Sequence, residues 1–251
     1  LNRGYMFQIF GGSEEGGIGT GAYNEGTGKI EYTHDARYST YINLNGHIAG
    51  VSKKDNMTED IAECEFMYGG GFFGPIVGNT YVNLGSGRIF NSFAGSCNAD
   101  ILGHTETYIG RMIKDDYKNV MGGHVSDESA YVAGFPWIRD NTYGGNDLGG
   151  KIMSEKDFVG RVRNDVKGMV HKYNASSNAN PDVLKASAYT EYLQGRALGI
   201  FGGCYGTYDY KDRKFSAYTD ANGEPINGFT KPRLNNAFVN FRPTYDNEKN
   251  L

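Results

Sequence analysis

The chain reads Tyr68-Gly-Gly-Gly71, Ile76-Val-Gly78 and Thr80-Tyr-Val-Asn-Leu-Gly85, and then, at once, Phe93-Ala-Gly-Ser96, Ile101-Leu-Gly103 and Thr105-Glu-Thr-Tyr-Ile-Gly110. Each segment lies 25 residues after its counterpart, from 68 to 93, from 76 to 101 and from 80 to 105. An equal displacement at every landmark indicates an internal structural repeat rather than chance similarity in a Gly-rich chain.

Two short signatures of this repeat recur along the chain in the same order. The first is an aromatic residue or Met followed by small residues, and it begins at Phe10, Tyr68, Phe93, Met121, Tyr143 and Phe201. The second resembles a short strand, and it begins at Thr40, Thr80, Thr105, Ala130, Ala188 and Ala237. The step from a second signature to the next first signature is 13 residues in three cases (80 to 93, 130 to 143 and 188 to 201). Six units in this order predict a solenoid.

A unit of 25 residues accommodates about three strands of about five residues each, with their turns. It is shorter than a propeller blade of about 40 residues, and it lacks the helix of a leucine-rich repeat. Stacked units would pair each strand with its equivalents about 4.8 Å above and below. We therefore predict an all-β fold, a right-handed parallel β-helix of about six coils, in a single domain over residues 1–251. No initiator Met or signal sequence precedes the first signature, so we expect a fragment of a longer chain.

The second signature alternates with period two, which places successive side chains on opposite faces of a strand. We expect Val82 and Leu84 inside, and the same rule places Ile42, Thr107, Val132, Thr190 and Val239 inside. The outward position holds Glu106 and five aromatic residues, which are our candidate ligand-binding residues: Tyr41, Tyr81, Tyr131, Tyr189 and Phe238. Two roles are compatible with such an external ladder. The rings stabilise strand pairing or lie beneath an insertion, or they form an exposed strip that binds a glycan or a protein.

Some segments interrupt the repeat. Ser154 is a candidate N-cap, and apolar residues recur after it at helical spacing: Phe158, Val162, Val166, Met169, Val170 and Tyr173. We predict that residues 154–173 form an inserted amphipathic helix on the flank of the solenoid, with a partner-binding or membrane-surface helix as the alternative. Residues 206–236 form another excursion, in which Asn222-Gly223 is a turn signal that predicts a small hairpin.

Composition and motifs argue against several classes of function. The net charge is −4 and the Lys and Arg residues are scattered, so the sequence has no nucleic-acid-binding footprint. No apolar run approaches the roughly 18 residues of a transmembrane segment. The three Cys are widely spaced and the five His form no ligand pair. We therefore predict no metal site and no cofactor, and we assign no catalytic residues.

Carboxylates are the basis of an alternative function. Enzymes that cleave polysaccharides on β-helix scaffolds need acids clustered on one face. The nearest candidates are Asp100, Glu106, Asp147, Glu191, Asp209 and Asp212. Glu106 and Glu191 lie on recurrent strands but at different registers, and solvated charges account for them. A polysaccharide-active β-helix enzyme, a lyase or glycoside hydrolase, is the alternative.

The aromatic-Gly-Gly run, a strand such as Thr80-Tyr-Val, and Ala237-Phe-Val-Asn-Phe241 together resemble the Gly-rich repeats of large surface or secreted proteins from Bacteroidetes-type bacteria, which are adhesin-like β-helix proteins. The resemblance covers most of residues 7–110 and 130–241 and carries over no catalytic residues. It implies an extracellular or cell-surface location and a structural or adhesive role. The expected partners are a glycan, a host or bacterial surface protein, and flanking parts of the same longer protein.

Overall fold

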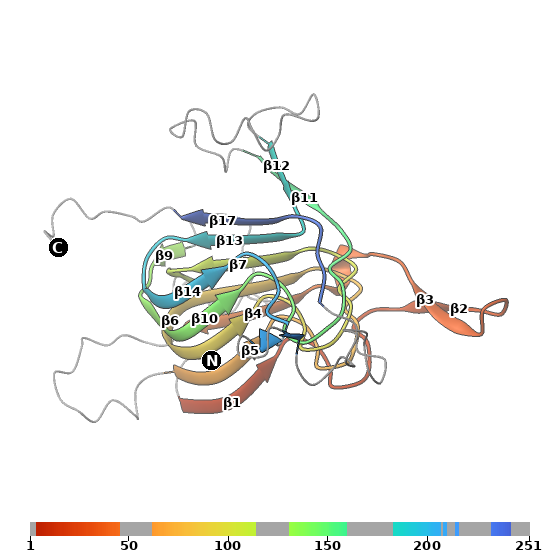
Figure 1. Cartoon of the computed structure of the whole chain (residues 1–251), viewed down its shortest axis with the longest axis horizontal. Helices are drawn as coiled ribbons and strands as arrows, with labels where there is room; N and C mark the ends of the chain where they lie inside the picture. The colour runs from red at the N-terminus through yellow and green to blue at the C-terminus, as the bar shows by residue number, and fades with distance from the viewer. Residues whose placement is uncertain are drawn as a thin grey trace, which may run out of the picture.

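The structure is a computed structural model, and it describes residues 4–45, 62–113, 131–159, 183–206, 208–209, 214–215 and 232–241. Over these residues the chain is all-β, as predicted, and its helical structure is one 3-10 turn, η1 (Ala36–Tyr38). Nine strands form one large sheet in which every strand pair is parallel. Figure 1 shows them one above another, from β1 (Gly4–Phe10) at the bottom to β17 (Ala237–Phe241) at the top.

The first signature ends a strand in each of five repeats. These strands pair in the order β1, β5 (Ala62–Tyr68), the second half of β6 (Thr80–Phe93), β10 (Pro136–Tyr143) and β14 (Arg196–Phe201). The register aligns five rings, which stack with centroids 4.7 to 5.1 Å apart and interplanar angles of 5 to 11°: Phe10, Tyr68, Phe93, Tyr143 and Phe201. Sequence analysis found the signature but did not predict that its rings form a ladder.

The second signature forms a matching run of strands. It consists of β4 (Thr40–Asn45), the first half of β6, β7 (Thr105–Ile109), β13 (Ala188–Tyr192) and β17. The predicted inward positions are confirmed, because Ile42, Val82, Leu84, Thr107 and Thr190 are buried and Val239 of the end strand is half-buried. Apolar side chains from both runs meet in one core, among them Leu84 from the second run and Ile89 from the first.

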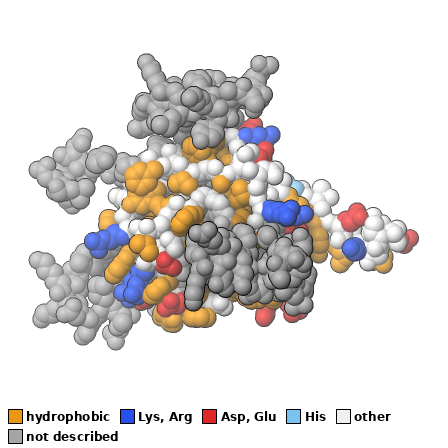
Figure 2. Space-filling model, in the orientation of Figure 1, with side chains coloured by type: hydrophobic (Ala, Val, Ile, Leu, Met, Phe, Trp, Pro, Cys, Tyr) orange, Lys and Arg blue, Asp and Glu red, His pale blue; other side chains and the backbone are white. Residues whose placement is uncertain are grey.

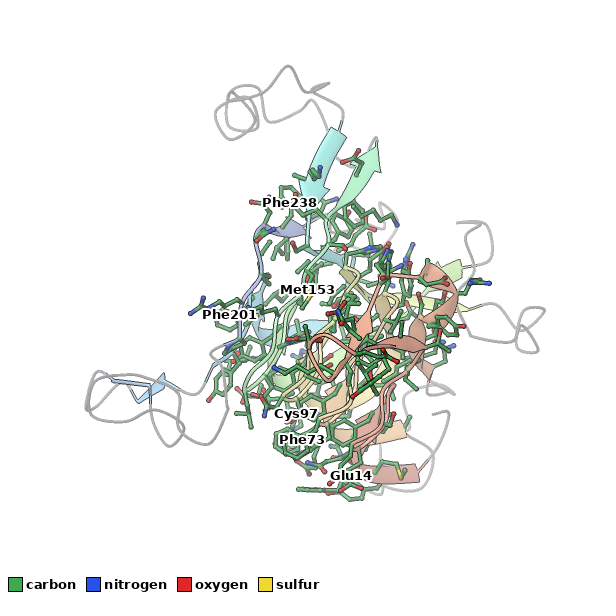
Figure 3. The ribbon with its side chains drawn as sticks, turned by 90° about the vertical axis from the view of Figure 1, so that its right-hand side faces the viewer. Glu14, Phe73, Cys97, Met153, Phe201 and Phe238 are labelled. Atoms are coloured by element: carbon green, nitrogen blue, oxygen red, sulfur yellow. The ribbon has the colours of Figure 1, made fainter. Side chains whose placement is uncertain are left out.

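A third set of contacts lies between the two signatures of each repeat. Isolated parallel bridges join Ile18 to Ile76, Ile76 to Ile101 and Ile101 to Ile152. These side chains pack together with Leu234. Figure 3, seen from the right of Figure 1, shows residues from four successive repeats following one another from bottom to top: Glu14, Phe73, Cys97 and Met153.

Close packing at the corners explains the small residues of the first signature. A Cβ added at Gly69 would lie 2.1 Å from the carbonyl oxygen of Ala94 in the next repeat. The hydroxyls of Thr40, Thr80 and Thr105 each donate a 2.5 Å hydrogen bond to a corner carbonyl of the following repeat, at Gly69, Ala94 and Gly144. Each Thr therefore ties the second-signature strand of one repeat to the corner of the next.

The described residues contain five aligned repeats, and the sixth predicted unit is not one of them. Its first signature, at Met121, lies outside the described residues. Its second signature falls in β9 (Tyr131–Ala133), which pairs antiparallel with β8 (Arg111–Ile113). Because β7 pairs directly with β13, the stack has no position for β9. The placement of Val132 inside and of Tyr131 in the ladder is therefore wrong.

Inserted hairpins branch from the stack, and those labelled at the right and at the top of Figure 1 project away from it. One is β2 (Gly21–Asn24) with β3 (Lys29–Tyr32), and another is β15 (Tyr208–Asp209) with β16 (Lys214–Phe215), which lies within the 206–236 excursion. The turn signal Asn222-Gly223, on which a hairpin was predicted, lies outside the described residues. A third is β11 (Lys156–Val159) with β12 (Val183–Ala186). Within the described part of the chain, no helix has the length and hydrophobicity that a membrane crossing requires.

The strand β11 contradicts the predicted helix at 154–173 wherever the structure describes that segment. Residues 160–173 lie outside the described residues. The physical reason is the packing of Phe158, which is 4% exposed and lies against the outer face of the sheet, while its neighbour Asp157 is exposed. Adjacent side chains that point opposite ways follow the period of a strand, not that of a helix.

Candidate functional site

The structure brings four of the five predicted ladder residues into one column on the outer face of the second-signature sheet. The register aligns Tyr41, Tyr81, Glu106, Tyr189 and Phe238, which we call the Tyr41 column. Tyr41 and Tyr81 stack with centroids 4.8 Å apart, and Tyr189 and Phe238 are nearly parallel at 6.3 Å. The fifth predicted residue, Tyr131, belongs to the β8–β9 hairpin instead.

The inserted hairpin β11–β12 covers the middle of the Tyr41 column. The ring of Phe158 stacks on Tyr189 with centroids 4.3 Å apart and meets the ring of His104 edge-on. As a result Tyr189 is 0% exposed, whereas Tyr41 retains 36%. The middle of the Tyr41 column therefore packs beneath an insertion, which is the first of the two roles that the sequence allows. The exposed part of the column is centred on Tyr41.

Glu106 is the charged centre of the covered region. Its Oε1 accepts a 2.6 Å hydrogen bond from Lys156 Nζ and lies 2.8 Å from His104 Nε2, and Tyr108 donates its hydroxyl to Oε2. Burial raises the pKa of Glu106, but the hydrogen bond with His104 and the charge of Lys156 outweigh burial and lower it to about 2. The ionised carboxylate thus holds the hairpin's Lys to the sheet and supplies no proton at neutral pH.

The other candidate acids are distributed over different surroundings. Glu191 is 1% exposed, like Glu106, and faces Tyr108 in register. Asp100 Oδ1 accepts a 2.8 Å hydrogen bond from the backbone N–H of Lys151. The side chain of Asp209 and all of residue Asp212 lie outside the described parts. Because Glu106 and Glu191 are both buried, neither carboxylate is accessible to a polysaccharide.

Asp147 lies in a separate pocket of side chains beside the ring ladder. The Tyr68 hydroxyl donates a 3.0 Å hydrogen bond to its Oδ2. Burial raises the pKa of Asp147 to about 6, and the bond from Tyr68 offsets only part of this effect. The same burial, together with the Asp147 charge, raises the pKa of the Cys97 thiol to about 12. Asp147 is therefore a buried carboxyl that keeps its proton up to about pH 6 and ionises above it.

A second outward face, on the first-signature sheet, is exposed. We call it the Trp137 strip, and it consists of Arg88, Phe90, Trp137, Arg139 and Arg196. Trp137, the one tryptophan of the chain, is 38% exposed. The guanidinium carbon of Arg139 lies 4.2 Å from the Phe90 ring centroid and 5.9 Å from that of Trp137, and Arg88 lies 5.7 Å from Trp137. Figure 2 shows basic and hydrophobic side chains side by side at the left of the view, where these strands run in Figure 1.

Two of the three Arg residues of the Trp137 strip form no ion pair with the described residues. Arg88 forms a 2.5 Å ion pair with Glu63 of β5. Arg139 and Arg196 are exposed, and no carboxylate of the described ranges lies within 4 Å of either guanidinium. Guanidinium groups beside exposed rings bind planar anions such as carboxylates well, because the rings hold them in position while their N–H groups stay free.

Sequence reasoning missed this strip, although a signal was present. In Pro136-Trp-Ile-Arg-Asp140 the apolar Ile138 alternates with Trp137 and Arg139, which places both of the latter on the outer face. Among the described residues, no three His, Cys, Asp or Glu side chains gather as metal ligands would. No protein family, no curated protein and no solved structure matches this chain.

Proposed function

We propose that this chain is a β-solenoid segment, a right-handed parallel β-helix, from an extracellular or cell-surface bacterial repeat protein with a structural and adhesive role. The support is the repetition of the same three contacts in successive repeats: a ring ladder, a column of Ile residues and an in-register second strand. Parallel pairing between repeats at every level is the arrangement that a solenoid requires. Such a stack is a long rigid support for a binding face.

The adhesive role is assigned to the Trp137 strip, with an acidic polysaccharide as its ligand. The observation that carries this assignment is the half-exposed Trp137 ring flanked by Arg139, which has no carboxylate partner in the described residues. An exposed aromatic face stacks on the apolar face of a sugar ring. A guanidinium binds carboxylate or sulfate groups through two parallel hydrogen bonds. Together they favour a glycan that carries such groups over a neutral one.

Binding to immobilised polysaccharides tests this assignment. The acidic probes are polygalacturonate and heparin, and the neutral probes are dextran and mannan. We expect binding to an acidic probe that falls at least tenfold, about 1.4 kcal/mol, in Trp137→Ala. Arg139→Gln should weaken acidic binding and leave neutral binding unchanged. Tyr41→Ala is the matched control, because Tyr41 is 36% exposed on the other sheet and Trp137 is 38% exposed.

Several outcomes of the binding measurement would contradict the assignment. In the first, the chain binds none of the probes. In the second, Trp137→Ala binds as the wild type does, or Tyr41→Ala loses binding to the same extent. A protein ligand would show instead as retention of a surface protein on the immobilised chain that polysaccharide does not displace, and it would also overturn the glycan assignment.

A further inference from the structure

Four outward side chains lie in one row across the strands of the first-signature sheet. The register aligns Glu63 of β5, Arg88 of β6, Trp137 of β10 and Arg196 of β14, and we call this set the Glu63–Arg196 row. Neighbouring strands lie about 4.8 Å apart, so the row runs along the axis of the stack. A pyranose residue lengthens an extended polysaccharide by about one strand spacing. A polysaccharide in this row would therefore meet one outward side chain with each sugar.

The charge of this row changes along its length. Glu63 and Arg88 form a 2.5 Å ion pair at one end, and their side chains are 16% and 18% exposed. Arg88 therefore already has a carboxylate partner. Arg196 at the other end is exposed, and no carboxylate of the described residues lies within 4 Å of its guanidinium. An acidic sugar is favoured at Arg196, whereas at Arg88 it competes with Glu63.

The other possible direction for a polysaccharide is along β10. Phe135, which is 50% exposed, precedes this strand, and Trp137 and Arg139 follow it at alternate positions. These side chains offer a sugar chain two rings and one cation. The next residue, Asp140, is a carboxylate, which repels an acidic ligand that continues past Arg139.

The geometry of β10 also favours the direction across the strands. Its register shifts against both neighbouring strands after Ile138, which is the mark of a β-bulge, and bulges re-aim side chains. Arg139 lies at this shift, and its guanidinium carbon is 4.2 Å from the ring centroid of Phe90 on β6. Arg139 therefore leans across the sheet, toward the neighbouring strand, and stays within 5.9 Å of the Trp137 ring centroid.

We propose that the acidic polysaccharide lies across the strands in the Glu63–Arg196 row, with one sugar on the Trp137 ring and the acid group of the next sugar on Arg196. This inference rests on the proposed role of the Trp137 strip in glycan binding. Arg139 binds the acid group of the stacked sugar itself, and Glu63 closes the other end of the row by holding Arg88. The row thus selects polysaccharides with acid groups on adjacent sugars.

Three variants test the direction of the polysaccharide. Binding is measured with polygalacturonate, or with heparin where that is the acidic probe that binds, at about 0.15 M salt to screen long-range charge effects. Arg196→Gln should weaken binding at least about fivefold, because a charge-assisted contact is lost. Lys151→Gln removes an exposed cation outside this sheet and is the matched control. This control and Phe135→Ala should each change binding by less than about twofold, with circular dichroism spectra equal to that of the wild type.

A second set of variants tests the closed end of the row. Glu63→Gln releases Arg88 for the ligand and should tighten binding at least about threefold. Glu65→Gln removes the same charge from the same strand and is the control, because Glu65 accepts a hydrogen bond from the Tyr5 hydroxyl and forms no ion pair with Arg88. The gain from Glu63→Gln should disappear when it is combined with Arg88→Gln.

The type of polysaccharide is tested with the wild type. Polygalacturonate has a carboxylate on every sugar and hyaluronate on every second sugar. At equal concentrations of carboxylate, we expect at least about threefold tighter binding of polygalacturonate. Equal binding of the two would contradict the selection of adjacent acid groups.

The outcomes separate this inference from the glycan role on which it rests. A wild type that binds no acidic probe would overturn both. If Trp137→Ala loses binding and Arg196→Gln does not, the glycan role stands and the proposed direction is wrong. Loss of binding in Phe135→Ala would then place the polysaccharide along β10. Equal effects of Arg196→Gln and Lys151→Gln, or of Glu63→Gln and Glu65→Gln, would indicate general charge attraction and would also overturn the inference.

Discussion

The buried carboxyl of Asp147 makes the stability of this protein depend on pH in an unusual direction. The side chain is 7% exposed and the Tyr68 hydroxyl is its one side-chain hydrogen-bond partner among the described residues. Burial disfavours the ionised form and raises the pKa of Asp147 from 3.8 to about 6. The folded state therefore holds a proton between about pH 4 and pH 6 that the unfolded state has released.

The sign and size of the effect follow from this difference in bound protons. Because the folded state binds more protons, the free energy of unfolding falls as pH rises through this window. A pKa raised by about 2, at about 1.4 kcal/mol for each pH unit, corresponds to a loss of about 3 kcal/mol by pH 7. Asp147→Asn does not ionise, and its amide oxygen can still accept the hydrogen bond from Tyr68.

Urea unfolding at pH 4, 5, 6 and 7, followed by the fluorescence of Trp137, measures the effect. We expect the free energy of unfolding of Asp147→Asn to rise relative to wild type by about 3 kcal/mol from pH 4 to pH 7. Comparing the two proteins at each pH cancels the contributions of all other titrating groups. Asp157→Asn, at an exposed carboxylate, is the matched control for the change of charge. A difference between Asp147→Asn and wild type that is constant over this range would refute the reasoning.

Three further changes test the packing of the stack, each by urea unfolding at pH 7. Gly69→Ala forces a Cβ against a backbone carbonyl of the next repeat, so it should lower the free energy of unfolding by about 3 kcal/mol. Gly203→Ala is its control, because no atom lies within 4 Å of the added Cβ, and it should change the free energy of unfolding by less than about 0.5 kcal/mol. Lys156→Met should lower the free energy of unfolding by about 1–3 kcal/mol, because Glu106 loses its cation. The double variant Lys156→Met with Glu106→Gln should lose less free energy of unfolding than the two single variants together. Phe93→Ala removes a buried ring from the middle of the ladder and should cost about 3–5 kcal/mol, while equal stability would show that the rings do not pack as described.

The strand pairing was largely predictable because the repeat carries its own register. The 25-residue displacement between Thr80 and Thr105 corresponds to direct strand pairing in the structure. The alternation of Val82 and Leu84 with Tyr81 also gave the correct inner and outer faces. Both inferences hold because side-chain direction in a strand is set locally, by the pleat.

Two short patterns were misassigned because they do not specify a partner. Ala130-Tyr-Val resembles a second signature and has the same 13-residue step to the next ring at Tyr143, yet Tyr131 pairs within an inserted hairpin. The apolar spacing that begins at Phe158 fits a helix, but the described part of that segment is a strand whose Phe158 ring packs on Tyr189. Tertiary contacts decided both cases.

By itself, the sequence determined that this protein is all-β, that its strands repeat in register and which face of each second-signature strand points outward. Only the tertiary structure decided which outward residues reach solvent. Tyr189 was predicted on the outward ladder, with its exposure left open, and is buried, while Trp137 was not singled out and is exposed. The physical reason is that direction depends on the local backbone, whereas exposure depends on where inserted segments such as β11–β12 lie, and a repeat pattern holds no information about them.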